Sequence, residues 1–264
     1  MSRFNGCEFI YSGISSINYS LRIVEFDSTG KQEYESGGES KLLIDTIYRK
    51  PKVSYYGRTR DVQLGLDFTV ASFDALSVED QSLIKAWLLG SPKYTTLQII
   101  QDDMSSIFYS CIITKASDIK VGNMGYGLNI HAECDSPWAW EEVKTLTKTY
   151  GGGGVANETF NFYNASIDQD YTWPTIEFVT NSIGDGITLT NSTDDGRQFV
   201  FAGLSANEDI KVDNYNKIVT SSTGLYRLSK FNLKFFRLLQ GMNSITILGA
   251  ISSFKMTYQF ARGG

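Results

Sequence analysis

The chain has 264 residues, of which 42% are hydrophobic and 20% charged, which is enough to bury one large or two ordinary cores and excludes a disordered, low-complexity protein. Its formal net charge of −5 excludes a protein that grips nucleic acid through clustered basic residues. No apolar run approaches the roughly 20 residues that cross a bilayer, and residues 1–6 contain no apolar signal-peptide core, so we expect assembly in a cytoplasm.

The first half of the chain begins with a non-periodic stretch and then becomes regular. Residues 28–41 are polar and contain glycine, which indicates an exposed loop or an arm that contacts something outside its own domain. Strict alternation of apolar and polar residues then predicts a strand over 62–70, because a strand places alternate side chains on opposite faces. Asp67 belongs to the polar set of this strand.

One segment follows a helical rather than a β pattern. Ser77 and Asp80 have the spacing of a capping box, which starts a helix. Apolar residues at helical spacing come next: Leu83, Ile84, Trp87 and Leu88. We therefore predict one amphipathic helix over 78–89, ended by Gly90, because glycine tolerates a left-handed cap.

Three further strands are predicted before residue 135. Those at 94–101 and 107–114 are joined by a polar turn at 102–106, which is typical of a hairpin, and the third spans 126–134. Its polar set is Asn129, His131 and Glu133. His131 is the single histidine of the chain, and its mid-strand position favours a surface or interface role over catalysis.

The composition around residue 150 indicates a boundary between two domains. Four consecutive glycines at 151–154 lose much backbone entropy when ordered, so they favour a flexible joint. We predict an N-terminal domain at 1–145, a glycine-rich linker at 146–156 and a C-terminal domain at 157–264. The three cysteines, Cys7, Cys111 and Cys134, are odd in number and widely spaced, which favours buried free thiols over disulfides or a metal site.

Short strands recur every eight to twelve residues in the second half, which is typical of an antiparallel sandwich. The predicted strands are 158–163, 174–180, 186–191, 197–202, 208–213, 216–220, 231–236, 244–249 and 252–260. The predicted fold class is therefore mainly β, with one helix in the first domain and a sandwich in the second.

The sequence contains no motif that predicts catalysis, a metal or a cofactor. A serine or cysteine nucleophile needs a neighbouring base, and His131 is the lone candidate. The aspartates at 168, 170, 194 and 195 lack the spacing of a calcium loop and are better explained as turn residues. The glycine tetrad lacks the lysine of a phosphate-binding loop.

A cluster of aromatic residues leaves one binding alternative open. Tyr163, Tyr171 and Trp173 cluster near the start of the second domain, and aromatic rings can stack on sugars. Packing of the sandwich is the favoured explanation, since β proteins use aromatic residues heavily in their cores. Tyr171 and Trp173 remain candidates for contact with a carbohydrate.

Several stretches resemble one family in their order and spacing. They are 4–6, the basic segment 49–57, the helix end at 84–88 with 94–97, the strand end at 133–138, and then 203–213, 231–235 and 241–245. Taken together, these stretches resemble the distal tail proteins (Dit) of siphophages, especially those that infect Gram-positive bacteria. The resemblance spans nearly the whole chain.

The resemblance implies a non-enzymatic structural protein of the virion, located at the phage tail tip or baseplate. It implies a homo-hexameric ring formed by the first domain, with a galectin-like sandwich at the periphery. The implied partners are the tail tube protein, the tail-tip hub (tail-associated) protein, and a tape measure or receptor-binding protein.

The ring leaves a channel for DNA, and Asp67, Asn129, His131 and Glu133 are candidate channel-facing residues. Their lack of positive charge would let DNA pass without sticking. No insertion large enough for an added carbohydrate-binding module is present. The alternatives are recognition of a host-surface carbohydrate by the second domain, and a wall hydrolase.

Overall fold

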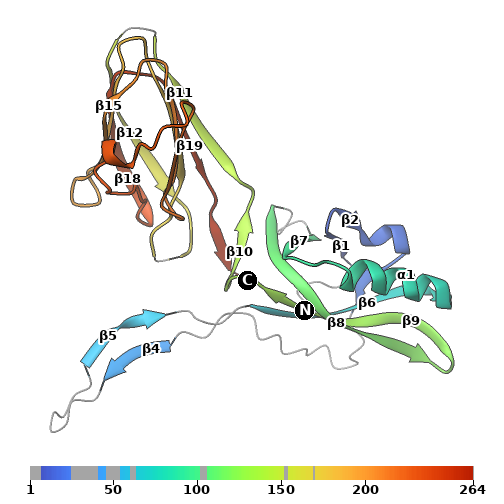
Figure 1. The fold of residues 1–264 in the computed structure, drawn as a ribbon. Coiled ribbons are helices and arrows are strands. Elements are labelled where there is room, and N and C mark those ends of the chain that lie inside the picture. The colour runs from blue at the N-terminus through green and yellow to red at the C-terminus, as the bar shows by residue number, and fades with distance from the viewer. Residues whose placement is uncertain are drawn as a thin grey trace. The chain divides into compact units, whose positions relative to one another are not determined.

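The computed structural model describes residues 7–24, 64–101, 106–151, 154–168 and 170–263, and the backbone alone of 41–45 and 54–59. The predicted arm at 28–41 and the predicted turn at 102–106 lie outside the described residues except for their last positions. The chain forms two compact units, Met1–Trp140 with Gly263–Gly264 (unit 1) and Glu141–Arg262 (unit 2) (Figure 1).

Unit 1 is built on one antiparallel sheet with the strand order β2-β1-β7-β8-β9-β6-β3, and β10 pairs with β8. Its strands are β1 (Glu8–Tyr11), β2 (Ile14–Ser15), β3 (Arg22–Val24), β6 (Gly65–Leu76), β7 (Thr95–Ile100), β8 (Ile107–Val121), β9 (Met124–Cys134) and β10 (Trp138–Glu141). A short 3-10 helix, η1 (Ser16–Tyr19), follows β2, and β4 (Lys41–Asp45) pairs with β5 (Ser54–Thr59).

The strands expected from alternation are confirmed, and β8 and β9 extend further than predicted. Leu66, Phe68 and Val70 of β6 are buried, whereas Gly65 and Asp67 are exposed. Cys111 and Cys134 are buried free thiols that lie directly opposite each other in β8 and β9.

The predicted helix is α1 (Val78–Leu89), and it lies against β8 (Figure 1). The Ser77 hydroxyl accepts a hydrogen bond from the Asp80 backbone N–H, and the Asp80 carboxylate accepts one from the Ser77 backbone N–H. Ile84 and Leu88 are buried in the core. No helix among the described residues is long and apolar enough to cross a membrane.

The predicted end of this helix requires a correction. Gly90 has φ −81°, so its conformation is right-handed and not left-handed. Close packing explains the glycine instead, because a Cβ at this position would lie 2.3 Å from the Ala86 carbonyl oxygen.

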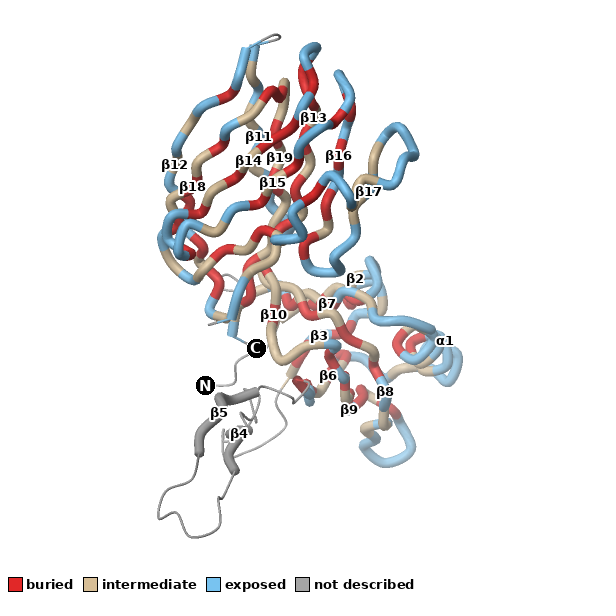
Figure 2. The backbone as a smooth tube through the Cα atoms, turned by 60° about the vertical axis from the view of Figure 1, so that its left-hand side comes forward, coloured by how far each residue is buried: buried red, intermediate tan, exposed pale blue. Residues whose placement is uncertain are grey.

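Unit 2 is a sandwich of two antiparallel sheets, ordered β11-β19-β13-β16-β17 and β12-β18-β14-β15 (Figure 2). Its strands are β11 (Lys144–Thr149), β12 (Ala156–Asn164), β13 (Thr175–Thr180), β14 (Asp185–Asn191), β15 (Arg197–Leu204), β16 (Asp209–Asp213), β17 (Ile218–Ser221), β18 (Gly241–Gly249) and β19 (Ile251–Tyr258). A 3-10 helix, η2 (Leu228–Lys230), follows β17, and β20 (Ala261–Gly263) follows β19.

Phenylalanine rings form much of the core of unit 2. Phe199 contacts three of them, with ring centroids 5.4 Å from Phe201, 4.9 Å from Phe231 and 6.5 Å from Phe236. The alternation predicted near the C-terminus is present in β19, where Phe254 and Met256 are buried.

The strand predicted at 231–236 is wrong. Among these residues only Phe231 forms an isolated bridge, to Phe201. The Asn232 side chain accepts from the Val200 backbone N–H and donates to the Gln198 carbonyl, so it takes hydrogen bonds that a strand beside β15 would make. Leu233 has a positive φ of 60°, which breaks an extended conformation.

The division between the units falls after Trp140, which is earlier than the predicted linker at 146–156. Strand β11 pairs with β19 along its whole length, so it belongs to the sandwich. Gly151 and Gly154 lie between β11 and β12, which are both strands of unit 2. Backbone pairing therefore places these glycines within the second unit.

Candidate functional surfaces

The four residues predicted to face a channel lie on one face of the unit 1 sheet. In the pairing of β6, β9 and β8, Asp67 lies opposite His131, and His131 lies opposite Lys115. The imidazole Nδ1 of His131 is 2.8 Å from a carboxylate oxygen of Asp67. The Thr69 hydroxyl donates to the Asn129 side-chain oxygen at 2.7 Å.

Glu133 extends the same polar face, which is defined by Asp67, Asn129, His131 and Glu133. Its carboxylate accepts a hydrogen bond from the Thr114 hydroxyl at 3.3 Å. Acidic, basic and neutral groups therefore alternate across three strands, so the face presents no uniform positive field to a phosphate backbone.

A second surface of unit 1 is apolar, and sequence reasoning missed it. We call it the hairpin-end patch, and its members with their exposed fractions are Phe73 (94%), Val78 (85%), Val121 (68%) and Met124 (59%). Val121 and Met124 pair at the tip of the β8–β9 hairpin, and Leu76 pairs with Gly125 beside them.

The other two members of the patch are Phe73, near the end of β6, and Val78, at the start of α1. The register of β6 against β9 shifts between Ala71 and Leu76, and Phe73 lies within the shift. The Gln81 side chain of α1 donates to the Leu76 carbonyl at 2.9 Å, which anchors the helix start beside β6. Alternation alone would not reveal the exposure of Phe73, because Phe73 lies in this irregular pairing.

The two aromatic residues proposed for sugar contact lie together in unit 2, with ring centroids 6.1 Å apart. Cations cover both rings. The Lys217 ammonium lies 3.3 Å from the centroid of the Trp173 ring, and the Arg237 guanidinium lies 3.6 Å from that of Tyr171. One face of each ring is therefore already occupied by a charged side chain.

Hydrogen bonds and charge hold these cations in place. Arg237 makes a two-pronged ion pair with Asp194, at 2.8 and 2.9 Å. Lys217 donates to the Asn214 carbonyl, and burial together with the nearby Arg197 and Arg237 lowers its pKa. Each ring therefore packs against a charged side chain on one face.

The predicted turn aspartates occupy turns. The Asp168 carboxylate accepts from the Asp170 backbone N–H at 3.0 Å, and the Arg197 backbone N–H donates to the Asp194 carbonyl at 2.8 Å. Within the described part of the chain, no group of three or more histidine, cysteine, aspartate or glutamate residues could hold a metal ion.

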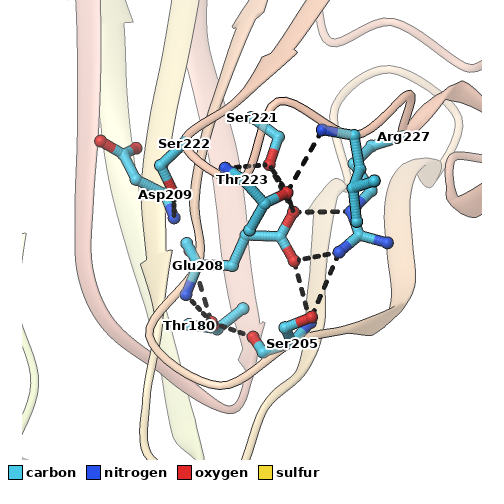
Figure 3. Close-up of polar contacts among 9 residues, drawn as sticks. Thr180, Ser205, Glu208, Asp209, Ser221, Ser222, Thr223 and Arg227 are labelled. Carbon is cyan, nitrogen blue, oxygen red and sulfur yellow. Dashed lines mark hydrogen bonds and ion pairs between the residues drawn. The ribbon is translucent and has the colours of Figure 1, made fainter.

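A buried ion pair in unit 2 was not predicted. Glu208 is fully buried and binds Arg227 through both carboxylate oxygens, with Nε at 2.6 Å and Nη2 at 2.8 Å (Figure 3). The Ser221 hydroxyl and the Ser205 backbone N–H also donate to this carboxylate. The cluster ties the loops before β16 and after β17 together, as Figure 3 shows.

These contacts determine the charge state of Glu208. Burial alone would raise its pKa, but hydrogen bonds from Arg227, Ser221 and the Ser205 backbone outweigh burial and lower the pKa to about 2. The carboxylate is therefore ionised at neutral pH.

A lowered pKa in the folded state predicts acid sensitivity. The stabilisation is complete above the ordinary glutamate pKa of 4.5 and is lost as the pH falls through about 2. We expect this group to contribute a fall of roughly 3 kcal/mol in the free energy of unfolding across that range. Denaturant titrations from pH 5 to pH 2 would measure it. Glu208→Gln should flatten the dependence, and an unchanged dependence would contradict this account.

Two family models match the chain. One is described as the phage tail protein N-terminal domain and matches residues 4–136, and the other is described as the phage tail C-terminal domain and matches residues 138–258. No curated protein matches the sequence significantly.

Two solved structures are similar to the chain. One is the crystal structure of the Dit protein of phage SPP1, which is described as a paradigm of the hub adsorption apparatus in phages that infect Gram-positive bacteria. It has a TM-score of 0.69 and 14% identity to this chain, and the match covers 96% of this chain and 99% of that one. A chain of the phage P2 baseplate in its activated conformation with calcium has a TM-score of 0.49 and 11% identity, with 96% and 97% covered. The first comparison shows that the two units have the fold of SPP1 Dit.

Proposed function

Since this chain belongs to the family of phage tail proteins, whose two domain models match residues 4–136 and 138–258, we propose that it forms a hexameric ring in a long non-contractile tail. The ring connects the tail tube to the baseplate hub or tail tip and leaves a central channel for DNA. The role is structural and not enzymatic. Assembly takes place in the host cytoplasm before the ring enters the virion.

The observation that carries this proposal is the hairpin-end patch of unit 1. Four large apolar side chains, exposed by 59% to 94%, lie at one end of a sheet whose inner face is a buried apolar core. Covering such side chains contributes about 1.5–3 kcal/mol each. A neighbouring copy of unit 1 can cover them, and a head-to-tail contact that closes after a fixed rotation makes a ring.

The polar face of β6, β9 and β8 suits the wall of the proposed channel. Asp67, Asn129, His131 and Glu133 carry no net positive charge as a group, and the two carboxylates offset the charge of Lys115, which lies opposite His131. Neighbouring strands hold the side chains of these four residues. A wall of this kind gives DNA few cationic contacts, so it does not retain the passing duplex.

The proposed partners are the tail tube protein on one side of the ring and the tail-tip hub protein on the other. A tape measure or receptor-binding protein is a further proposed neighbour. Sugar recognition through Tyr171 and Trp173 has less support, because Lys217 and Arg237 lie over those two rings.

Polar substitution in the patch tests the ring interface. The double variant Phe73→Ser and Val121→Ser removes two exposed apolar side chains without altering the buried core. We expect the association constant between copies to fall by roughly a hundredfold or more, because each side chain contributes over 1.4 kcal/mol when covered. Sedimentation velocity over a concentration series measures the change.

A matched control is Tyr215→Ser, which removes another highly exposed side chain from unit 2. This variant should associate as the wild type does. Equal association of the double variant and the wild type would show that the patch does not form the interface between copies.

A further inference from the structure

The outward face of the four-stranded sheet in unit 2 carries a continuous set of uncharged side chains, and the exposed Asp185 and the Lys230 ammonium lie at the Gly203 end of the sheet. We call this uncharged set the neutral face. Most of its residues bear a hydroxyl or an amide, and the rest are apolar: Asn157, Thr159, Asn161, Tyr163, Thr188, Thr190, Gln198, Val200, Ala202, Met242, Ser244, Thr246 and Leu248.

Strand register arranges the polar groups in rows across the sheet. Gln198 lies opposite Thr190, Thr190 opposite Thr246, and Thr246 opposite Thr159. The hydroxyls of Thr159 and Thr246 are 2.8 Å apart, which shows that they point to the same side. Since neighbouring strands are about 4.8 Å apart, the row forms a regular series of donors and acceptors.

The opposite sheet of the sandwich has a different outward face. There Glu177 of β13 forms ion pairs with Lys255 of β19 and Lys211 of β16. Charged side chains make up 20% of the chain, so their absence from the neutral face distinguishes the two sheets. Exposure to water alone does not explain why one outward face has ion pairs and the other is uncharged, because charged residues are common at solvated strand positions.

Tyr163 lies at one end of the neutral face. Its side chain is 63% exposed, and it pairs with Met242 across β12 and β18. Asn161 and Ser244 form the next pair along the same strands. Unlike Tyr171 and Trp173, Tyr163 has no cation or second ring against it among the described residues. Its ring is therefore available to a ligand.

We propose that the neutral face binds an uncharged oligosaccharide, with Tyr163 stacking on a sugar ring. The hydroxyls and amides of Asn161, Thr159 and Thr246 exchange hydrogen bonds with sugar hydroxyls. A neutral ligand fits because none of the residues proposed to contact it is charged. A protein partner fits less well, because the face offers rows of hydroxyls and amides and one aromatic ring, and not the cluster of aromatic and arginine side chains that forms the centre of protein interfaces. The site is separate from the proposed ring interface, which belongs to unit 1.

The test is binding of the full chain to an immobilised panel of neutral oligosaccharides built from hexoses and N-acetylhexosamines, with acidic oligosaccharides beside them. We expect at least one neutral member to bind, and the acidic members to bind no better than their neutral counterparts. Tyr163→Ala should weaken that binding by roughly tenfold or more, because stacking on an aromatic ring is lost. Thr159→Lys should have a similar effect, because it places a charge in the central row.

Matched controls use the opposite parts of the sandwich. Tyr215→Ala removes an exposed aromatic ring, and Thr147→Lys adds a charge to an exposed position of β11, so both should leave binding unchanged. Binding to no neutral oligosaccharide would overturn the proposal, as would binding that persists in both neutral-face variants. Loss on Tyr171→Ala with retention in Tyr163→Ala would place the sugar at the other aromatic pair. None of these outcomes depends on ring formation.

Discussion

Replacement of Arg227 by methionine is expected to lower the free energy of unfolding of unit 2 by about 3–5 kcal/mol, because breaking a buried ion pair leaves an uncompensated charge. Arg227 supplies two hydrogen bonds to the fully buried carboxylate of Glu208. Three smaller donors, the Ser221 hydroxyl, the Thr223 hydroxyl and the Ser205 backbone, cannot replace the lost positive charge.

Denaturant unfolding of the full chain, followed by tryptophan fluorescence and circular dichroism, measures this loss. Lys255→Met is the control, since Lys255 is 43% exposed in its ion pair with Glu177 and exposed pairs contribute about 0–1 kcal/mol. Arg227→Met should also make the acid sensitivity of the chain less steep, because it raises the pKa of Glu208. Equal losses of unfolding free energy in Arg227→Met and Lys255→Met would contradict the expectation that the buried ion pair matters more than the exposed one.

Trp87→Ala is expected to destabilise unit 1 by about 3–5 kcal/mol, as deletion of a large packed aromatic side chain usually does. The indole stacks on Tyr19 at 5.0 Å and on Phe9 at 5.7 Å between ring centroids. Its N–H donates to the Tyr11 carbonyl at 3.1 Å, so the substitution also leaves that acceptor without its donor. Helix α1 should then lose its attachment to β1.

Thermal and denaturant unfolding of the full chain measure this second loss. Leu83→Ala on the same helix is the matched control, because Leu83 is largely exposed and alanine preserves helix propensity. We expect the control to change the free energy of unfolding by less than about 0.5 kcal/mol. If Leu83→Ala lowered the free energy of unfolding as much as Trp87→Ala does, α1 would not pack on the sheet through the face that contains Trp87.

Much of this fold could be predicted from the sequence where one local signal decided the outcome. Alternation correctly separated the two faces of β6 and β9, since each strand has one buried side. The capping box at Ser77 located the start of α1 to the residue. Residues 231–236 show the limit, because apolar composition suggested a strand where the side chain of Asn232 pairs with β15 instead.

The candidate surfaces depend on contacts between distant segments and were harder to predict. The strand pattern brought Asp67 and His131 to one face, but their direct contact requires the register of β6 and β9. Glu208 and Arg227 are ordinary polar residues in the sequence, and only the fold buries them together. The sequence does not indicate that Lys217 covers the ring of Trp173, because the two residues are distant in sequence and only the fold brings them together.

If copies of this chain close into a ring, the mass of the purified full chain in solution should be a multiple of the mass of one copy. Mass photometry over a concentration series, with electron microscopy of the largest species, would give both the number of copies and the symmetry. We expect particles of six times 29.5 kDa with sixfold symmetry and an open centre. A 29.5 kDa monomer at every concentration, or an open filament without a channel, would contradict it.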